Sequence, residues 1–574
     1  MLLATLFTQN ACDLFRDAPS DSLSEESIWT TPLLLDEYTL AWYRNMNSGF
    51  SVYMPTNGLL KGMSREYLPW FGDQITVSKT EWFSTAYGDI LKSNLQELQR
   101  KGLILWTNYY SQIQSVNRLL ENQDKIKEGE QKTRVLGEAY FFRAYYYYML
   151  MQRYGGALLI EKNYDPIRDN KKFPRASYDE MVSFITADAE KAAALLPEKQ
   201  IASNLGRAAK GAALMLKAKT YLWASSEVFQ NKEKSYLGFT SDRSAAMIEK
   251  AVAAYDEVMT QGYTLLPVTG DTEDKIKESY RNIFLTKNSD ESIFEVQHSD
   301  DGDFSTGYGH KLDRESVTPF EGGTTAAYTP TQNHVDEYGM REGTTFDPLN
   351  PYRNRDYRFY ANVLYDGCTF RGRTMKIHYT KTNGKEVAGE DLTPYGSSTT
   401  AAVSKTGYYM GKFVNQNQKI DNDQVKASSQ NYIIWRYAEV LLDYAELAFR
   451  QNKQGIALDM VNQIRRRAHM HELASVTWED IVNERRVEMA FEETTYWDMF
   501  RWGVAYEKMR GTENPLYAMK IVREEGKDPV FTVSKLNKYP ARVRDFRPYQ
   551  YYLPIPWSEV RYQEIEQNPE WIEQ

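Results

Sequence analysis

Residues 432–470 constrain the fold most, because their apolar positions follow the spacing of two consecutive helices. Apolar or small residues recur every three or four positions, which is the pattern of one face of an amphipathic helix. This face comprises Ile434, Ala438, Leu441, Ala445 and Ala448. Gly455 interrupts the pattern near a polar turn, and a second helix is predicted from Ala457, Met460, Ile464 and Ala468. Small alanines allow two antiparallel helices to approach closely, as in a tetratricopeptide hairpin, and further helix pairs are expected to stack against this one.

Three more helix pairs are predicted upstream. They pair residues 81–99 with 105–126, 130–154 with 178–196, and 206–229 with 245–261. The run 141–148 is aromatic on all sides, which favours a helix packed between neighbours over a box that holds a ligand. The pairs differ in length, so the prediction is a mainly α fold. It is an irregular tetratricopeptide-like scaffold of about four helix pairs with long insertions of loop and short strand.

The helical period fades after Leu266, and a long insertion separates the third helix pair from the fourth. We predict a strand at 291–297, a loop at 299–331, short strands within 348–368 and 372–382, and a polar loop at 387–423. Loops longer than about 12–15 residues in a compact chain are usually functional or disordered. The aromatic residues in these loops favour function.

Aromatic residues also gather in a loop rich in Gly and Pro at 49–79. The family resemblance described below implies, by position only, that the candidate ligand contacts come from the loops at 64–82 and 300–330. They are Arg65, Tyr67, Trp70, Asp73, Trp82, Phe304, Tyr308, His310, Phe320 and Tyr328. For each aromatic ring among them, the alternative is that it fills a gap between loop and scaffold.

Composition excludes several classes of function. The net charge of -9 argues against a nucleic-acid partner, which would require a basic face. No nucleotide-binding loop, nucleophile elbow or HExxH motif is present. Asp300, Asp301 and Asp303 lack the rest of a calcium loop, so a solvated turn is favoured and no cofactor is predicted. Glu484 and Arg485, together with Glu488, are predicted to form a buried ion network and not to act as acid/base groups.

Cys12 follows a short apolar run and Ala11, which partly matches a lipoprotein signal. No Lys or Arg precedes Cys12, and Gln9 stands where leucine is usual, so composition alone favours a chance cysteine. If the signal is real, its basic segment is expected upstream of Met1. No stretch approaches the ~20 apolar residues of a membrane span.

The resemblance of this chain to a known family rests on an ordered set of motifs along nearly its whole length. The first motifs lie in the two predicted helices of residues 432–470. They are RYAE at 436–439, LL at 441–442 and YAE at 444–446, then Asn462, IR at 464–465 and RA at 467–468. The motifs that follow are ERRVEMAFE at 484–492, WDMFRWG at 497–503, YLPIP at 552–556 and NP at 568–569. The motifs upstream are RA at 143–144, YG at 154–155, ESIFE at 291–295 and RDYRF at 355–359. By this ordered set of motifs, the chain resembles the SusD/RagB family. It departs at His469, where glycine is usual, and at Glu493 and Thr495, where local repacking is expected.

The resemblance implies a cell-surface protein attached to the outer membrane by lipid on Cys12. Such a protein lies over a SusC-like TonB-dependent barrel and passes it an oligosaccharide, or less often a peptide. It has no catalytic group. The implied regions are a signal remnant and lipid tether at 1–23, a helical region at 24–266, and a C-terminal region at 267–574. That last region divides into ligand-binding insertions at 267–429, the fourth helix pair at 430–470 and a closing segment at 471–574.

Two other classes of protein stay open on the sequence alone. An intracellular tetratricopeptide scaffold needs no lipid anchor and no clustered loop aromatics. A glycoside hydrolase needs two carboxyl groups about 5–10 Å apart, which sequence does not reveal. The identity of the glycan also depends on loop geometry, and Cys368 has no predicted role.

Overall fold

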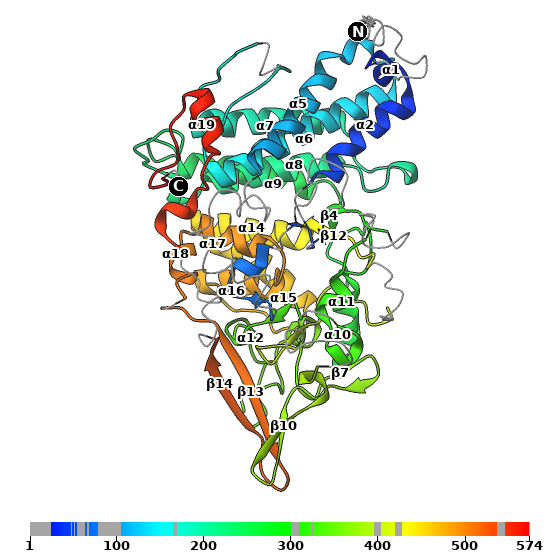
Figure 1. The fold of residues 1–574 in the computed structure, drawn as a ribbon, viewed down its shortest axis with the longest axis vertical. Coiled ribbons are helices and arrows are strands. Elements are labelled where there is room, and N and C mark those ends of the chain that lie inside the picture. The colour runs from blue at the N-terminus through cyan, green and yellow to red at the C-terminus, as the bar shows by residue number, and fades with distance from the viewer. Residues whose placement is uncertain are drawn as a thin grey trace, which may run out of the picture.

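The computed structural model describes residues 25–46, 49–50, 68–78, 105–164, 169–299, 309–323, 326–394, 403–418, 428–511, 513–536 and 546–572, and the backbone of β1 (Val52–Tyr53) and β2 (Ser64–Arg65). The molecule is elongated (Figure 1). A layer of long helices forms one end, α14 to α17 lie in the middle, and a narrow sheet forms the other end. The prediction of a mainly α fold is confirmed.

The helical layer comprises α1 (Glu25–Thr30), α2 (Pro32–Arg44), α5 (Trp106–Glu121), α6 (Glu130–Tyr154), α7 (Tyr178–Leu195), α8 (Lys210–Ala224) and α9 (Ser244–Met259). Helix α6 packs against α5 and α7, and α8 packs against α7 and α9. The predicted pairs 130–154 with 178–196 and 206–229 with 245–261 are therefore present as neighbouring helices. The predicted helix at 81–99 lies outside the described residues, while its predicted partner is present as α5.

The aromatic run of α6 is buried on every side, as predicted. Phe141, Phe142, Tyr145, Tyr146 and Tyr147 are all fully buried. A helix without a polar face is stable in water only when neighbours cover it all round. Here α2, α5, α7 and α8 provide that cover.

The start of the fourth helix pair differs from the prediction. Residues 432–436 form a strand, β12 (Tyr432–Arg436), which pairs antiparallel with β4 (Ser292–Val296). Ile434 therefore belongs to a strand and not to the helix, since a short β-branched and aromatic run suits a buried strand. The helices are α14 (Tyr437–Arg450) and α15 (Gln454–Arg467), with Gly455 inside the first turn of α15. The predicted strand at 291–297 is confirmed as β4.

Helix α14 joins the fourth pair to the helical layer, because it packs against α9 as well as α15 and α16 (Trp478–Glu488). The short helices α17 (Thr494–Arg501) and α18 (Ala505–Lys508) belong to this part, whereas α19 (Trp557–Gln563) lies beside the helical layer (Figure 1). His469 has φ 56°, a left-handed conformation that favours glycine. Its ring Nε2 lies 2.8 Å from the carbonyl oxygen of Val268, a side-chain contact that glycine could not make.

The insertion contains more regular structure than predicted. Its helices are α10 (Glu273–Asn282), α11 (Leu312–Ser316), α12 (Gln332–Val335) and α13 (Tyr357–Asn362). The range 348–368 thus holds α13 as well as β6 (Val363–Leu364), and the predicted loop 387–423 holds β11 (Tyr409–Met410), which pairs with β6. The projecting sheet has the order β10-β9-β13-β14, formed by β9 (Tyr379–Thr382), β10 (Lys385–Ala388), β13 (Tyr517–Glu524) and β14 (Val530–Lys535). Small antiparallel pairs join β7 (Thr369–Phe370) to β8 (Arg373–Thr374) and β3 (Ile75–Thr76) to β5 (Thr329–Pro330).

Candidate functional site

The two loop regions that the sequence singles out meet in the structure. Strand β3 pairs with β5, which places Ile75 opposite Pro330 and Thr76 opposite Thr329. The backbone N–H of Ser78 donates to the carbonyl oxygen of Ala326 at 3.0 Å. These bonds fix residues 74–78 to residues 326–331, so the two segments share one part of the core.

Most of the predicted contacts whose side chains are described lie in that core. Trp70 is 2% exposed and donates its indole N–H to the carbonyl oxygen of Ala327 at 2.8 Å. Tyr328 is fully buried, and its ring centroid lies 5.3 Å from that of Trp70. Asp73 is also buried and accepts a hydrogen bond from Arg486 at 2.8 Å. In this conformation neither Trp70 nor Tyr328 presents an open face to a ligand.

His310 and Phe320 have opposite environments. His310 is buried, and burial lowers the pKa of its imidazole to about 4, so the ring is neutral at pH 7. Phe320 is 42% exposed, and the guanidinium of Arg373 lies 4.4 Å from its ring centroid. The side chains of the other predicted residues lie outside the described residues: Cys12, Arg65, Tyr67, Trp82, Phe304 and Tyr308.

Asp300, Asp301 and Asp303 are likewise outside the described residues. Within the described part of the chain, no group of three or more His, Cys, Asp or Glu side chains is arranged to hold a metal ion. In the same residues, no helix combines the length and the apolar character needed to cross a bilayer.

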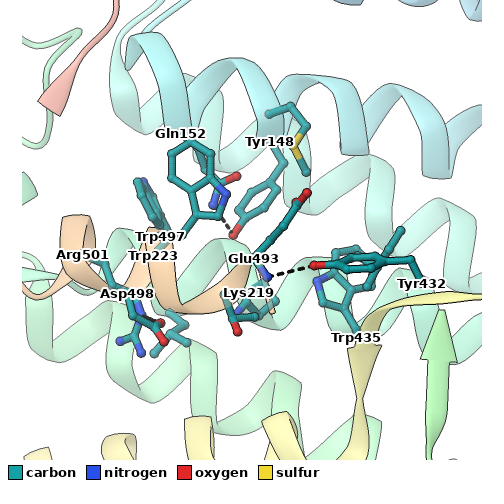
Figure 2. A pocket seen from close by; sticks show the side chains of 14 residues that line it. Tyr148, Gln152, Lys219, Trp223, Tyr432, Trp435, Glu493, Trp497, Asp498 and Arg501 are labelled. Carbon is teal, nitrogen blue, oxygen red and sulfur yellow. Dashed lines mark hydrogen bonds and ion pairs between the residues drawn. The ribbon is translucent and has the colours of Figure 1, made fainter. Parts of the chain in front are cut away.

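A pocket that the sequence did not indicate lies between the helical layer and the middle of the molecule (Figure 2). We call it the scaffold pocket. It has about 560 Å³ of empty space including its open mouth. Its lining comes from α6, α8, β12, and the segment that enters and forms α17: Tyr148, Met149, Gln152, Lys219, Leu222, Trp223, Tyr432, Ile434, Trp435, Glu493, Thr494, Trp497, Asp498 and Arg501.

Paired charges form the polar side of the scaffold pocket. The ammonium group of Lys219 lies 2.6 Å from Glu439 Oε1 and 3.3 Å from Asp443 Oδ2. Asp498 accepts from Arg485 at 2.5 Å and from Arg501 at 2.8 Å. Burial opposes ionisation of Asp498, but the two guanidinium groups outweigh burial and lower its pKa to about 2. Burial has the opposite net effect on Glu439 and raises its pKa to about 7.

Glu484 and Arg485 are both buried, as predicted, but they do not form one pair. Arg485 contacts Asp443 at 2.7 Å and Asp498 at 2.5 Å. Glu484 instead accepts from Arg358 at 2.5 Å and from Arg465 at 2.9 Å. Adjacent residues on a helix point about 100° apart, so these two side chains enter different networks.

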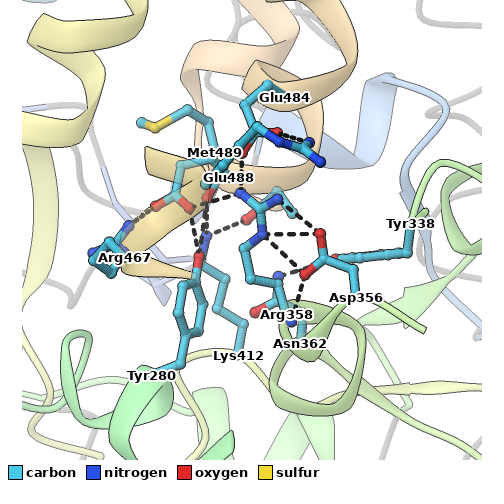
Figure 3. Close-up of polar contacts among 12 residues, drawn as sticks. Tyr280, Tyr338, Asp356, Arg358, Asn362, Lys412, Arg467, Glu484, Glu488 and Met489 are labelled. Carbon is cyan, nitrogen blue, oxygen red and sulfur yellow. Dashed lines mark hydrogen bonds and ion pairs between the residues drawn. The ribbon is translucent and has the colours of Figure 1, made fainter. Parts of the chain in front are cut away.

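The network that contains Glu484 joins the insertion to the fourth helix pair (Figure 3). Glu488 is its centre and accepts from Arg436 at 2.8 Å and from Arg358 at 3.2 Å, with Arg467 as a further partner. Burial raises the pKa of Glu488, but the surrounding guanidinium groups outweigh it and hold the pKa well below its usual range. A carboxylate that is buried and saturated by guanidinium groups is suited to a structural role and not to proton transfer.

Comparison with known proteins agrees with the motif order. Residues 290–571 match the family model described as "SusD family", and residues 54–222 match the model described as "Starch-binding associating with outer membrane". A SusD-like protein of Bacteroides ovatus is 26% identical over 411 residues, which span 69% of this chain and 65% of that protein. SusD-like protein P38 of Formosa agariphila is 24% identical over 540 residues, which span 91% of this chain and 94% of that protein.

Solved structures show the same fold. The crystal structure of a SusD-like protein from Bacteroides fragilis has a TM-score of 0.73 at 25% identity, covering 97% of this chain and 100% of that chain. A SusD-like carbohydrate-binding protein from the same species has a TM-score of 0.70 at 23% identity, covering 93% of this chain and 99% of that chain. Together with the two family models, these relatives show that the chain belongs to the SusD/RagB family.

Proposed function

We propose that this protein is a cell-surface lipoprotein that captures an oligosaccharide without cleaving it and delivers it to a SusC-like TonB-dependent transporter in the outer membrane. The observation that carries the proposal is the match of residues 54–222 to a family described as starch-binding and associated with the outer membrane. Structural neighbours include a laminarin binding SusD-like protein and a surface glycan-binding protein A from Bacteroides fluxus. At 19% and 20% identity, these two share the fold with this chain.

The proposed ligand face lies on the segments at 64–82 and 300–330. The pairing of β3 with β5 supports this assignment, because it brings the two segments together. A sugar ring has an apolar C–H face that stacks on an aromatic side chain, while its hydroxyl groups require polar partners. Phe320 is exposed on one of these segments, and Trp70 and Tyr328 hold the two segments together from beneath.

Replacing Phe320 by alanine tests the ligand face. Loss of a stacking ring is expected to weaken oligosaccharide binding by about 1–3 kcal/mol, a ten- to hundredfold rise in Kd. The melting temperature is expected to stay close to that of the wild type, because the ring is only partly buried. Calorimetric titration measures the affinity. Phe346→Ala is the matched control, since Phe346 is 55% exposed and lies outside both segments. An unchanged affinity for Phe320→Ala removes this residue from the ligand face.

Replacing Cys12 by serine tests the lipid anchor. Expressed from the full native gene start, Cys12→Ser is expected to move the protein from the membrane fraction to the soluble fraction, because lipid on this residue is the proposed attachment. Cys368→Ser is the control and is expected to stay with the membrane, since Cys368 is a free cysteine in the folded body. Fractionation and immunoblotting measure the distribution. A Cys12→Ser protein that remains in the membrane fraction contradicts the anchor.

A further inference from the structure

We propose that β14 pairs antiparallel with β14 of a second copy of this chain, which joins the two projecting sheets into one. Strand β14 lies on an outer edge of the projecting sheet, away from the helical layer (Figure 1). The pairing requires no glycan, lipid anchor or transporter, so it stands apart from the proposed function.

The first observation is that β14 has backbone groups that point away from its neighbour. It is the last strand in the order β10-β9-β13-β14, so within the described residues a strand lies on one side of it only. The N–H of Leu536 donates to the carbonyl oxygen of Leu516 at 2.8 Å, in the register of the β13–β14 pair. Because these groups alternate in direction along an antiparallel pair, the N–H and C=O groups of Phe531, Val533 and Lys535 point away from β13. They form a template for another strand.

The second observation is that this edge lacks the usual protection. Soluble proteins protect a free edge with charged side chains, proline or a bulge, or keep it very short. Strand β14 has six residues, contains no proline, pairs with β13 without a register shift, and carries its charged residue, Lys535, at its end. Strand β10, on the opposite edge of the same sheet, has four residues, and Lys385 and Glu386 are charged. The sheet is therefore protected at one edge and open at the other.

The third observation is the exposure of apolar side chains on β14. Val530 is 57% exposed and Val533 is 52% exposed. Val533 lies directly opposite Met519 of β13, which is buried, so its exposure arises on the side away from β13. A strand placed beside β14 would cover Val533 and remove apolar surface from water.

The charges and backbone groups of β14 favour a twofold axis that passes through Val533. An antiparallel strand can pair with its own copy about such an axis, which gives a closed dimer. Phe531 of each copy then lies opposite Lys535 of the other, and every backbone group that points away from β13 finds a partner. An ammonium group beside an aromatic ring is a favourable pair, and no like charges face each other. The two copies of Val533 meet on the axis.

Other axes fit less well. An axis at Thr532 places Lys535 opposite Pro529, which has no N–H to donate. An axis at Phe531 places Lys535 opposite Lys527, and like charges directly opposite each other are destabilising. Axes closer to the end of the strand pair fewer of its residues.

The dimer is expected to be weak and reversible. A strand of six residues covers an area at the low end of specific protein interfaces, so we expect a dissociation constant in the micromolar range.

Sedimentation equilibrium of the full chain carrying Cys12→Ser, so that no lipid is attached, tests the pairing. Over about 5 to 500 µM, which spans a micromolar dissociation constant, the average mass is expected to rise from that of the monomer toward that of the dimer. Val533→Lys is expected to raise the dissociation constant at least about fivefold, because two ammonium groups then meet on the axis. The matched control is Val387→Lys, which alters a valine of β10 that is 62% exposed and is expected to leave dimerisation unchanged.

A mixture of two variants tests the axis itself. Val533→Lys and Val533→Glu are each expected to dimerise poorly alone, whereas an equimolar mixture is expected to recover dimerisation because opposite charges then meet on the axis. A misfolded variant would not be rescued in this way, and circular dichroism of each variant checks the fold independently.

Each of three results overturns the proposal. A wild type that stays monomeric at every concentration means that the edge is open or serves a strand of another protein. A dimer that persists unchanged in Val533→Lys places the interface elsewhere. A mixture that fails to recover dimerisation means that the two copies of Val533 do not meet.

Discussion

Arg485→Ala is expected to lower the free energy of unfolding by about 3–5 kcal/mol. Arg485 is fully buried and lies 2.7 Å from Asp443, 2.5 Å from Asp498 and 3.5 Å from Glu439. Among the described residues, removing its guanidinium leaves Lys219 paired with Glu439 and Asp443, and Arg501 paired with Asp498. A buried charge without a partner is costly because water no longer solvates it.

Urea unfolding followed by circular dichroism measures the loss. The control is Arg466→Ala, which removes an exposed guanidinium from an ion pair with Glu472 and is expected to leave stability close to that of the wild type. Equal stability of Arg485→Ala and the wild type would mean that Arg485 is solvated and does not take part in the buried ion network.

Trp70→Ala is expected to lower the free energy of unfolding by about 3–5 kcal/mol, because truncating a buried tryptophan leaves a cavity. Trp70 also holds the two loop regions together through its hydrogen bond to Ala327 and its contact with Tyr328. Sequence alone leaves two interpretations of Trp70 open: a sugar-stacking residue, whose loss would reduce affinity and spare stability, or a residue that fills a gap between loop and scaffold. Its burial favours the second, with stability falling first.

Trp70→Phe separates the two contributions of this side chain. Phenylalanine keeps most of the packing but cannot donate to Ala327, so the expected loss is smaller, about 1–3 kcal/mol. Thermal and urea unfolding of both variants measure the difference. An unchanged melting temperature for Trp70→Ala, accompanied by weaker glycan binding, would return Trp70 to the ligand face.

A helix could be predicted from the sequence where the apolar pattern continued over many residues and a glycine stood at each end. Helix α6 has the predicted bounds because it begins after Gly129 and ends before Gly155. The run 432–436 was assigned to a helix because a short apolar segment carries no period of its own, and only its pairing with β4 decides that it is a strand.

The candidate site was less predictable, because burial in loops depends on contacts distant in sequence. A Gly/Pro-rich loop suggested exposure for Trp70, but the pairing of β3 with β5 folds this loop against residues 326–331. The scaffold pocket had no local signal, since its lining runs from Tyr148 to Arg501 over four elements. The burial of Glu484 and Arg485 could be inferred from their helix, whereas their separate partners could not.

Calorimetric titration of the wild-type protein with malto- and laminari-oligosaccharides, and with a matched panel of peptides, tests the central claim of glycan capture. Reducing ends are assayed in the same samples. We expect saturable binding of at least one oligosaccharide, no saturable binding of peptides and no increase in reducing ends. Binding of peptides alone would contradict glycan capture, and release of reducing ends would show a hydrolase in place of a binding protein.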